Sequence, residues 1–323
     1  MIISAEISCN HAGSVDKAIQ LVAAAAACGA DAVKFQTFTP EKMAIRPYII
    51  EHGPWAGKDI QELYREAETP RDWHRPLFDI AEALGMVAFS TPFDVDSLNF
   101  LESINCPMYK IASFEIVDLE LIRACASTGK HLYISTGMAT WEEIEAAADA
   151  AKGTEFTFMK CTSSYPAPPG DANLRTMISL KRKFGSVGLS DHSKGLAVPI
   201  TATVLGASII EKHLTLSRTE GLDCDFSLEP DEFKQMVIEC RNAEKSIGET
   251  KYAVTESEHS SFALRSSLYI IKDIKSGEVL TQDHVGTSRP NLGMNPIKLG
   301  DVLNKTMAKS VNAGEPLTEE MVR

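Results

Sequence analysis

The sequence predicts an α/β protein whose larger part folds as a (β/α)8 barrel, followed by a small β-rich domain. Short β-branched runs alternate with longer amphipathic segments from Met1 to Gly248, the pattern of parallel βαβ units. Eight such units fit into this stretch, and eight close a barrel. A doubly wound open sheet is the alternative, but the first strand is followed by residues 9–13, CNHAG, instead of a glycine-rich dinucleotide loop.

The strands and helices follow from two different periodicities of apolar residues. Eight strands are expected at residues 2–8, 32–36, 86–90, 108–111, 131–135, 155–160, 187–190 and 209–214. Eight helices are expected at residues 15–28, 72–84, 94–104, 119–127, 141–151, 174–184, 196–205 and 230–247. The connection over residues 37–71 is unusually long, and a long loop on the catalytic face of a barrel usually contacts the ligand. A surface excursion without function is the alternative reading of this loop.

A domain boundary is expected after the barrel. We assign residues 1–248 to the barrel, the polar stretch 249–261 to a linker, and residues 262–323 to the small domain. The small domain contains an internal repeat, because KDIKSGEVLT from Lys272 to Thr281 recurs as KSVNAGEPLT from Lys309 to Thr318. Each copy is too short to bury its own apolar face, so the two copies are expected to pair.

Composition excludes several partners and settings. The chain has 32 Lys and Arg against 44 Asp and Glu, and its net charge of -12 repels nucleic acid and anionic membranes. The apolar stretch from Leu21 to Cys28 is too short to span a membrane. The seven cysteines form no C-x-x-C motif, so we expect neither a disulfide framework nor a thiolate zinc site. A reducing, cytoplasmic location is therefore expected.

Polar side chains cluster where the predicted strands end, which is the catalytic face of a barrel. Burying Lys34 or Lys110 without a partner costs several kcal/mol, and a ligand with several negative charges removes that cost. With strand-end hydroxyls these lysines form a plausible cradle for a phosphate and a carboxylate; the hydroxyls belong to Thr91, Ser113, Ser135 and Ser190. Alternatively, each lysine pairs with an interior glutamate, such as Glu6 or Glu211, and fills the barrel.

Two histidines suggest a metal site. His192 and His213 end the seventh and eighth strands, which are neighbours in a barrel, and Asp191, Glu6 and Asp223 are expected near the same mouth. Imidazole and oxygen ligands suit Mn²⁺, Fe²⁺, Co²⁺ or Zn²⁺. Structural roles are expected instead for four other residues, His11, His74, His131 and Cys161.

The strand-end motifs, taken in order, resemble the family of sialic acid and related nonulosonic acid synthases. The matching segments are residues 5–13 (AEISCNHAG), 32–36 (AVKFQ), 90–93 (STPF), 110–113 (KIAS), 135–138 (STGM), 188–192 (GLSDH) and 211–213 (EKH). Residues 264–267 (LRSS) and the repeat look like this family's antifreeze-like (SAF) carboxyl-terminal domain. The resemblance therefore spans the chain, and the order of the motifs makes it specific.

This resemblance implies condensation of phosphoenolpyruvate with an open-chain N-acetylated amino sugar, with release of phosphate. The positions that match the phosphoenolpyruvate site are Lys34, Thr91, Lys110, Ser113, Ser135, Ser163 and Ser190. His192 and His213 match the metal ligands, and the expected ion is Mn²⁺, with Mg²⁺ or Co²⁺ as alternatives. The positions around the sugar and the reacting carbons are Glu6, Gln36, Glu115, Tyr165 and Asp223. Arg289 matches an arginine that the partner subunit lends to the substrate, which implies a domain-swapped homodimer.

Some segments resemble one branch of this family, the pseudaminic acid synthases. They are residues 53–55 (GPW), 67–74 (AETPRDWH), 162–166 (TSSYP) and 225–228 (DFSL). The acceptor of that branch is 2,4-diacetamido-2,4,6-trideoxy-altropyranose, whose methyl group suits a loop lined by Trp55, Tyr64 or Phe226. N-acetylneuraminate or legionaminate synthesis is the alternative within the family. A Schiff-base aldolase using the lysines, and a non-catalytic carbohydrate-binding protein, are the alternatives outside it.

Overall fold

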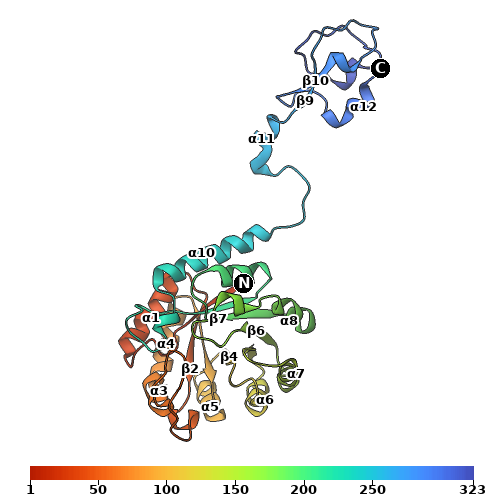
Figure 1. Ribbon diagram of the computed structural model, residues 1–323. Coiled ribbons are helices and arrows are strands. Elements are labelled where there is room, and N and C mark those ends of the chain that lie inside the picture. Colours follow the sequence, from red (N-terminus) through yellow and green to blue (C-terminus); the bar gives the residue numbers. More distant parts are fainter. The chain divides into compact units, whose positions relative to one another are not determined.

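The computed structural model describes residues 1–323 as two compact units, Met1–Gly248 and Glu249–Arg323 (Figure 1). In the first unit eight parallel strands, hydrogen-bonded in sequence order, close into a barrel, which confirms the predicted fold. The strands are β1 (Ile2–Glu6), β2 (Ala32–Thr37), β3 (Val87–Pro92), β4 (Met108–Ile111), β5 (His131–Ser135), β6 (Phe156–Cys161), β7 (Val187–Asp191) and β8 (Ile209–His213). No helix combines the length and the apolar character needed to cross a membrane.

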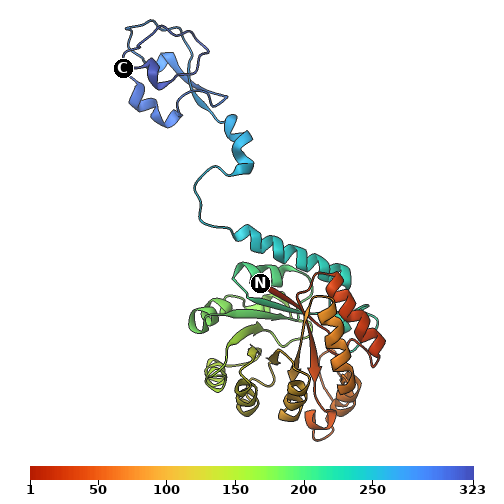
Figure 2. The same cartoon turned by 180° about the vertical axis from the view of Figure 1, so that it is seen from behind.

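Helices surround the barrel, and both views show them outside the strands (Figures 1 and 2). Polar residues begin several of them: Ser14 accepts a hydrogen bond from the backbone N–H of Lys17, and Thr140 forms a capping box with Glu143. The helices that follow the strands are α1 (Val15–Ala27), α4 (Arg71–Ala83), α5 (Val95–Ser103), α6 (Leu119–Ser127), α7 (Trp141–Ala150), α8 (Thr176–Phe184), α9 (Ala197–Val204) and α10 (Pro230–Ile247).

The long connection between β2 and α4 contains two helices that the sequence did not predict, α2 (Pro40–Met43) and α3 (Ile60–Ala67). Asp59 caps α3 by accepting from the backbone N–H groups of Gln61 and Glu62. Phe38 packs edge-on against Tyr64 and Phe93 with ring centroids 5.8 and 5.5 Å away. The connection therefore has its own apolar cluster at the carboxyl ends of the strands.

The alternation of side chains along β7 and β8 decides which strand-end groups reach the barrel interior. Asp191 and Lys212 face away from it and form a buried ion pair, with Lys212 Nζ 2.6 Å from Asp191 Oδ2. Lys212 Nζ also donates to the carbonyl of Ser193. The expectation that Asp191 lies at the mouth with the two histidines is wrong, because Asp191 directly follows the cavity-lining Ser190, and successive side chains of a strand point to opposite faces.

We predict that Lys212→Met destabilises the first unit by about 3–5 kcal/mol, because it leaves Asp191 buried and uncompensated. The matched control is Lys194→Met, since Lys194 and Asp225 form an exposed pair at 3.2 Å that is worth at most about 1 kcal/mol. Denaturant unfolding followed by tryptophan fluorescence checks this, because all three tryptophans lie in this unit. Equal midpoints for the two variants would contradict the prediction.

The second unit is built on the repeat. Strands β9 (Ser267–Ile270) and β10 (Val285–Ser288) pair antiparallel. Ile274 and Val311, at equivalent positions of the two copies, exchange backbone hydrogen bonds of 3.0 and 2.9 Å. The equivalent Leu280 and Leu317 are both fully buried. The two copies thus pair and share one core, as predicted.

Candidate active site

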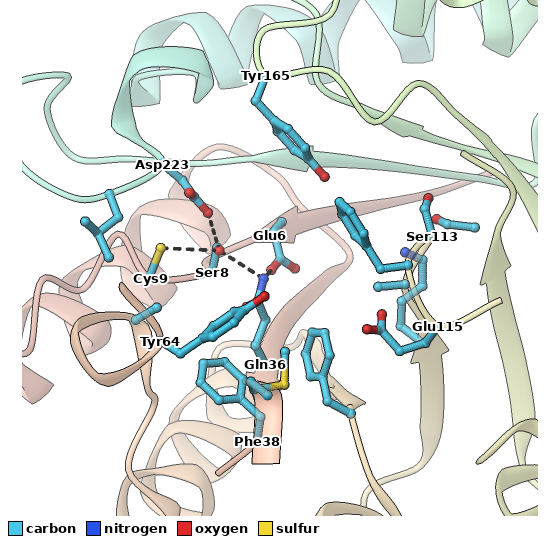
Figure 3. Close-up of a pocket in the computed structure, with 18 of the residues that line it drawn as sticks. Glu6, Ser8, Cys9, Gln36, Phe38, Tyr64, Ser113, Glu115, Tyr165 and Asp223 are labelled. Carbon is cyan, nitrogen blue, oxygen red and sulfur yellow. Dashed lines mark hydrogen bonds between the residues drawn. The ribbon is translucent and has the colours of Figure 1, made fainter. Parts of the chain in front are cut away.

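A cavity of about 520 Å³ opens at the carboxyl ends of the barrel strands (Figure 3). Its volume lies in the range of small-molecule sites. Most predicted site residues line it: Glu6, Lys34, Gln36, Lys110, Ser113, Glu115, Ser135, Tyr165, Ser190, His192, His213 and Asp223. The connection between β2 and α4 supplies much of its apolar wall, including Phe38, Met43, Trp55, Leu63 and Tyr64. The connection is therefore part of the cavity and not a surface excursion.

Two lysines and two glutamates form a buried charge cluster on the cavity floor. Lys34 Nζ lies 2.9 Å from Glu6 Oε2 and 3.6 Å from Glu211 Oε2, and Lys110 Nζ lies 3.4 Å from Glu211 Oε1. Burial opposes the charge on Lys34, but the neighbouring carboxylates outweigh burial and raise its pKa; burial lowers the pKa of Lys110. The lysines therefore pair with interior glutamates, as one interpretation expected, and they also line the cavity, where a ligand would meet them.

The hydroxyls beside this cluster differ in what they contact. Ser135 Oγ is buried and has no hydrogen-bond partner, so it is available to a ligand. Ser190 donates to Glu211 Oε1 at 2.9 Å. Thr91 accepts from Lys34 Nζ at 3.1 Å and lies behind the cavity wall. Ser163 also lies outside the lining, 3.9 Å from the sulfur of Cys161.

Gly137 packs closely against the side chains of Ser113 and Ser163. Its backbone N–H donates to Ser113 Oγ at 3.1 Å, and a Cβ added at this position would lie 2.7 Å from Ser113 Oγ and closer still to Ser163 Oγ. We predict that Gly137→Ala raises the KM for an anionic substrate about tenfold, because overpacking of this kind costs roughly 1–3 kcal/mol. Gly170→Ala is the control, since nothing lies within 4 Å of its added Cβ. An unchanged KM in Gly137→Ala would refute this role.

The two histidines lie side by side, with ring centroids 5.3 Å apart. His192 Nδ1 donates to the carbonyl of Thr162 at 3.0 Å, which leaves its Nε2 lone pair free. His213 Nδ1 is buried without a hydrogen-bond partner, and burial lowers the pKa of this ring well below its ordinary value. Imidazole nitrogens that no protein group occupies fit a divalent cation. No group of three His, Cys, Asp or Glu side chains is close enough to form a complete protein site.

Cys161, for which a packing role is expected, is buried but also lines the cavity. Its sulfur lies 3.8 Å from His192 Nδ1. Burial opposes ionisation of the thiol, but the adjacent imidazole outweighs burial and lowers the pKa of Cys161 to about 6. The other histidines for which structural roles are expected each contact a threonine hydroxyl: His11 with Thr69, His74 with Thr37 and His131 with Thr157.

Glu115 is a buried carboxyl group in the lining of the cavity. Burial raises its pKa to about 7, from an ordinary value of 4.5, and its Oε2 has no hydrogen-bond partner. The carboxyl group points into the cavity in Figure 3. Near neutral pH it therefore exists partly as a neutral acid, which can donate a hydrogen bond to a ligand.

We predict that Glu115→Gln changes how stability depends on pH. Below about pH 4.5 the wild-type carboxyl is protonated in both states; between about pH 4.5 and 7 the unfolded chain loses the proton first, so the free energy of unfolding falls. The variant avoids this loss and becomes more stable than wild type above pH 7, by at most about 3 kcal/mol. Unfolding curves at pH 4.5 and 8 check this, with the exposed Glu51→Gln as control. A pH-independent difference would contradict it.

Of three further residues that the sequence singled out, Trp55 lines the cavity, and Arg289 and Phe226 do not. Arg289 is exposed in the second unit, directly after β10. Trp55 lines the cavity and packs against Tyr165, with ring centroids 5.4 Å apart. Phe226 is buried behind the cavity and packs edge-on against His213 at 5.0 Å.

Sequence reasoning missed Ser8 and underrated Glu211, which was weighed only as barrel filling. Glu211 lies two residues before His213 on β8, and residues two apart share a face of a strand. That spacing was the available signal for Glu211. Ser8 lies beyond the end of β1, so strand spacing gives no signal for it.

Comparison with known proteins gives a consistent result. A model of the NeuB family matches residues 21–252, and a model of the SAF domain matches residues 265–323. A pseudaminic acid synthase of Campylobacter jejuni strain 81-176 is 40% identical over 332 residues, covering 100% of this chain and 97% of that protein. An N,N'-diacetyllegionaminic acid synthase of Campylobacter jejuni serotype O:2 is 34% identical, covering 98% of this chain and 99% of that protein.

A solved structure adds to these relatives. The N-acetylneuraminic acid (sialic acid) synthetase of Leptospira borgpetersenii, in complex with citrate, superposes with a TM-score of 0.72 at 34% identity, covering 80% of this chain and 89% of that chain. The family resemblance read from the strand-end motifs is thus confirmed. The chain belongs to the NeuB family and carries a SAF domain in its second unit.

Proposed function

We propose that this enzyme condenses phosphoenolpyruvate with 2,4-diacetamido-2,4,6-trideoxy-altropyranose, forming pseudaminic acid and inorganic phosphate. The observation that carries the proposal is the cavity at the strand ends. Two buried lysines lie there beside the imidazoles of His192 and His213 and an apolar wall. The full-length relative at 40% identity, a pseudaminic acid synthase, supports this product. The relative that makes a legionaminic acid is less similar, at 34%, and that product is the second candidate.

Charge balance favours a divalent cation beside bound phosphoenolpyruvate. In the cluster, Lys34 and Lys110 are already balanced by Glu6 and Glu211. A ligand with a phosphate and a carboxylate would therefore bring uncompensated negative charge into a buried site. A divalent cation held by His192 and His213 offsets two of these charges. We expect Mn²⁺, with Mg²⁺ or Co²⁺ as alternatives.

The phosphoenolpyruvate end of the cavity is assigned to charged and hydroxyl groups of β2, β4, β5 and β7 and of the turn after β4. Lys34 and Lys110 supply charge-assisted hydrogen bonds to the anionic groups. Ser135 supplies a free hydroxyl, and Ser113 and Ser190 lie in the same lining. Thr91 and Ser163 lie behind the lining, so we propose that they support Lys34 and the Gly137 turn and do not touch the ligand.

The sugar end is assigned to Gln36, Glu115 and Tyr165, with the apolar wall of the β2–α4 connection beside them. The acceptor has a methyl group at carbon 6 and two acetamido methyl groups. An apolar wall that includes Phe38, Trp55 and Tyr64 lowers the cost of burying these groups. The Phe38, Met43 and Leu63 side chains of this wall would give no hydrogen-bond partner to a hydroxyl at carbon 6, and leaving that hydroxyl unpaired costs free energy.

The chemistry follows from the placement of these groups. Carbon 3 of phosphoenolpyruvate attacks the aldehyde carbon, and the electron pair of its double bond forms the new carbon–carbon bond. When bound, the divalent cation supplies Lewis-acid polarisation of the aldehyde oxygen. Glu6 faces the positive character that develops at carbon 2. The aldehyde oxygen, which loses its double bond to carbon, takes up a proton and becomes a hydroxyl. Water adds at carbon 2, and Glu6 or Asp223 takes up one of its protons. The carbon–oxygen bond to phosphate then breaks, inorganic phosphate leaves with that electron pair, and the hydroxyl at carbon 2 loses its proton to give the ketone.

The remaining assignments concern the second unit and the setting. We propose that residues 1–248 form the catalytic barrel, 249–261 a linker, and 262–323 a domain that completes the partner's site in a domain-swapped homodimer. Exposed Arg289 would then reach the substrate of the partner subunit. The seven free cysteines suit a reducing compartment, so we place the enzyme in the cytoplasm.

The test is phosphate release from phosphoenolpyruvate in the presence of a panel of acceptors. The panel contains the trideoxy altrose derivative, the precursor of legionaminic acid, and N-acetylmannosamine, each with and without chelator. We expect the altrose derivative to give the highest kcat/KM, and mass spectrometry to show pseudaminic acid. A higher kcat/KM with another acceptor would overturn the product assignment, and no release with any acceptor would overturn the reaction.

A further inference from the structure

Ser8 lies at the centre of a hydrogen-bond network that joins three elements of the cavity (Figure 3). Its hydroxyl lies 2.5 Å from Asp223 Oδ2, in the loop after β8, and 3.0 Å from Gln36 Nε2 on β2. Gln36 Nε2 also donates to Glu6 Oε1, on β1, at 3.1 Å. Ser8 and Glu6 are 1% exposed, so these contacts are shielded from bulk solvent.

Counting donors fixes the direction of each hydrogen bond. The amide nitrogen of Gln36 carries two protons, and its two partners are Glu6 Oε1 and Ser8 Oγ. The Ser8 oxygen is therefore an acceptor toward Gln36. Its single proton is directed to Asp223 Oδ2, because the other neighbour, the sulfur of Cys9, is 3.7 Å away and is a weak acceptor.

We propose that Ser8 is a positioning residue that holds the Asp223 carboxylate against the cavity and links it, through Gln36, to Glu6. This inference rests on the proposed function, in which these two carboxylates act on the carbon that is attacked by water. Without the hydroxyl, Asp223 keeps its burial but loses this donor, and a buried acceptor without a partner is unfavourable. The carboxylate would then rotate away from its working orientation.

The backbone at Ser8 supports a functional role and supplies a control. Its φ of 48° lies in the left-handed region, which non-glycine residues adopt at a cost. Glycine adopts this conformation without that cost, so Ser8→Gly removes the hydroxyl and relieves the backbone. Ser8→Ala removes the hydroxyl and keeps the strain. The two variants therefore differ in stability but not in the hydrogen bond they lose.

The experiment measures kcat and KM of the full chain for Ser8→Ala and Ser8→Gly, with thermal unfolding. We expect both variants to lower kcat about tenfold, with the KM for phosphoenolpyruvate unchanged within about twofold, although Ser8→Gly unfolds at the higher temperature. Ala12→Gly is the matched control, because Ala12 has a φ of 47°, is exposed and has no hydroxyl. We expect it to keep the wild-type kcat.

A double-mutant cycle shows whether Ser8 acts through Asp223. In the Asp223→Ala background, Ser8→Gly is expected to change kcat by less than about twofold, because the group it positions is gone. A wild-type kcat in Ser8→Gly, or the same tenfold loss in the Asp223→Ala background, would overturn the inference alone. A wild-type enzyme that releases no phosphate with any acceptor would overturn the proposed function and, with it, this inference.

Discussion

Replacing His213 with alanine is expected to lower kcat by about 10³-fold or more, because the change removes one of two ligands for the cation. The ring is buried, its Nδ1 has no hydrogen-bond partner, and its neighbour His192 lies 5.3 Å away between centroids. With only two protein nitrogens in the site, loss of either one leaves a single ligand. Added Mn²⁺ is therefore not expected to restore the variant.

Metal binding separates this role from a structural one. Equilibrium dialysis with Mn²⁺ is expected to show one ion per wild-type chain and none at the same concentration in His213→Ala. His131→Ala is the matched control, because His131 contacts Thr157 and lies outside the cavity lining. It is expected to keep both the ion and the activity. Full activity of metal-loaded His213→Ala would show that the histidine pair does not hold the ion.

Replacing Lys110 with methionine is the second large expected effect. Lys110 is buried, faces the cavity and lies 3.4 Å from Glu211 Oε1. Methionine keeps most of the volume but removes the charge, so the site loses a cation for the substrate and leaves Glu211 with less compensation. Removing one partner of a buried charge pair costs about 2–5 kcal/mol, which corresponds to a rise in the KM for phosphoenolpyruvate of at least about thirtyfold.

Lys160→Met is the control for this prediction. Lys160 also lies near the carboxyl end of a strand, but its Nζ donates to the carbonyl of Cys161 and to Thr162 Oγ1, away from the main cavity. Its removal is expected to leave the KM for phosphoenolpyruvate within about twofold of wild type. An equal change in the KM for phosphoenolpyruvate in the two variants would contradict a role of Lys110 in binding this substrate.

Periodicity in the sequence predicted the barrel well because its strands and helices carry strong, separate patterns. Helix α6 (Leu119–Ser127) and strand β4 (Met108–Ile111) match their predicted bounds. The helices α2 and α3 were missed, since they lie in a proline-rich connection that is stabilised by packing around Phe38. Tertiary contacts of this kind leave no local pattern in the sequence.

The candidate site was predicted as a set of strand-end residues, but its inward and outward members were not separated. Asp191 ends a strand directly after Ser190, yet it faces away from the cavity, because a shift of one residue reverses a side chain. The role of Ser8 depends on its contacts with Gln36 and Asp223, which is 215 positions away in the sequence. Only the folded chain brings such partners together.

In the proposed site, one cation held by His192 and His213 lies beside phosphoenolpyruvate bound to Lys34 and Lys110. A crystal soaked with Mn²⁺ and phosphoenolpyruvate, with data collected at the manganese edge, would locate both ligands. We predict one anomalous peak within bonding distance of both imidazoles, with the phosphate and carboxylate contacting the two lysines. An ion bound elsewhere, or phosphoenolpyruvate outside this cavity, would rule out this arrangement.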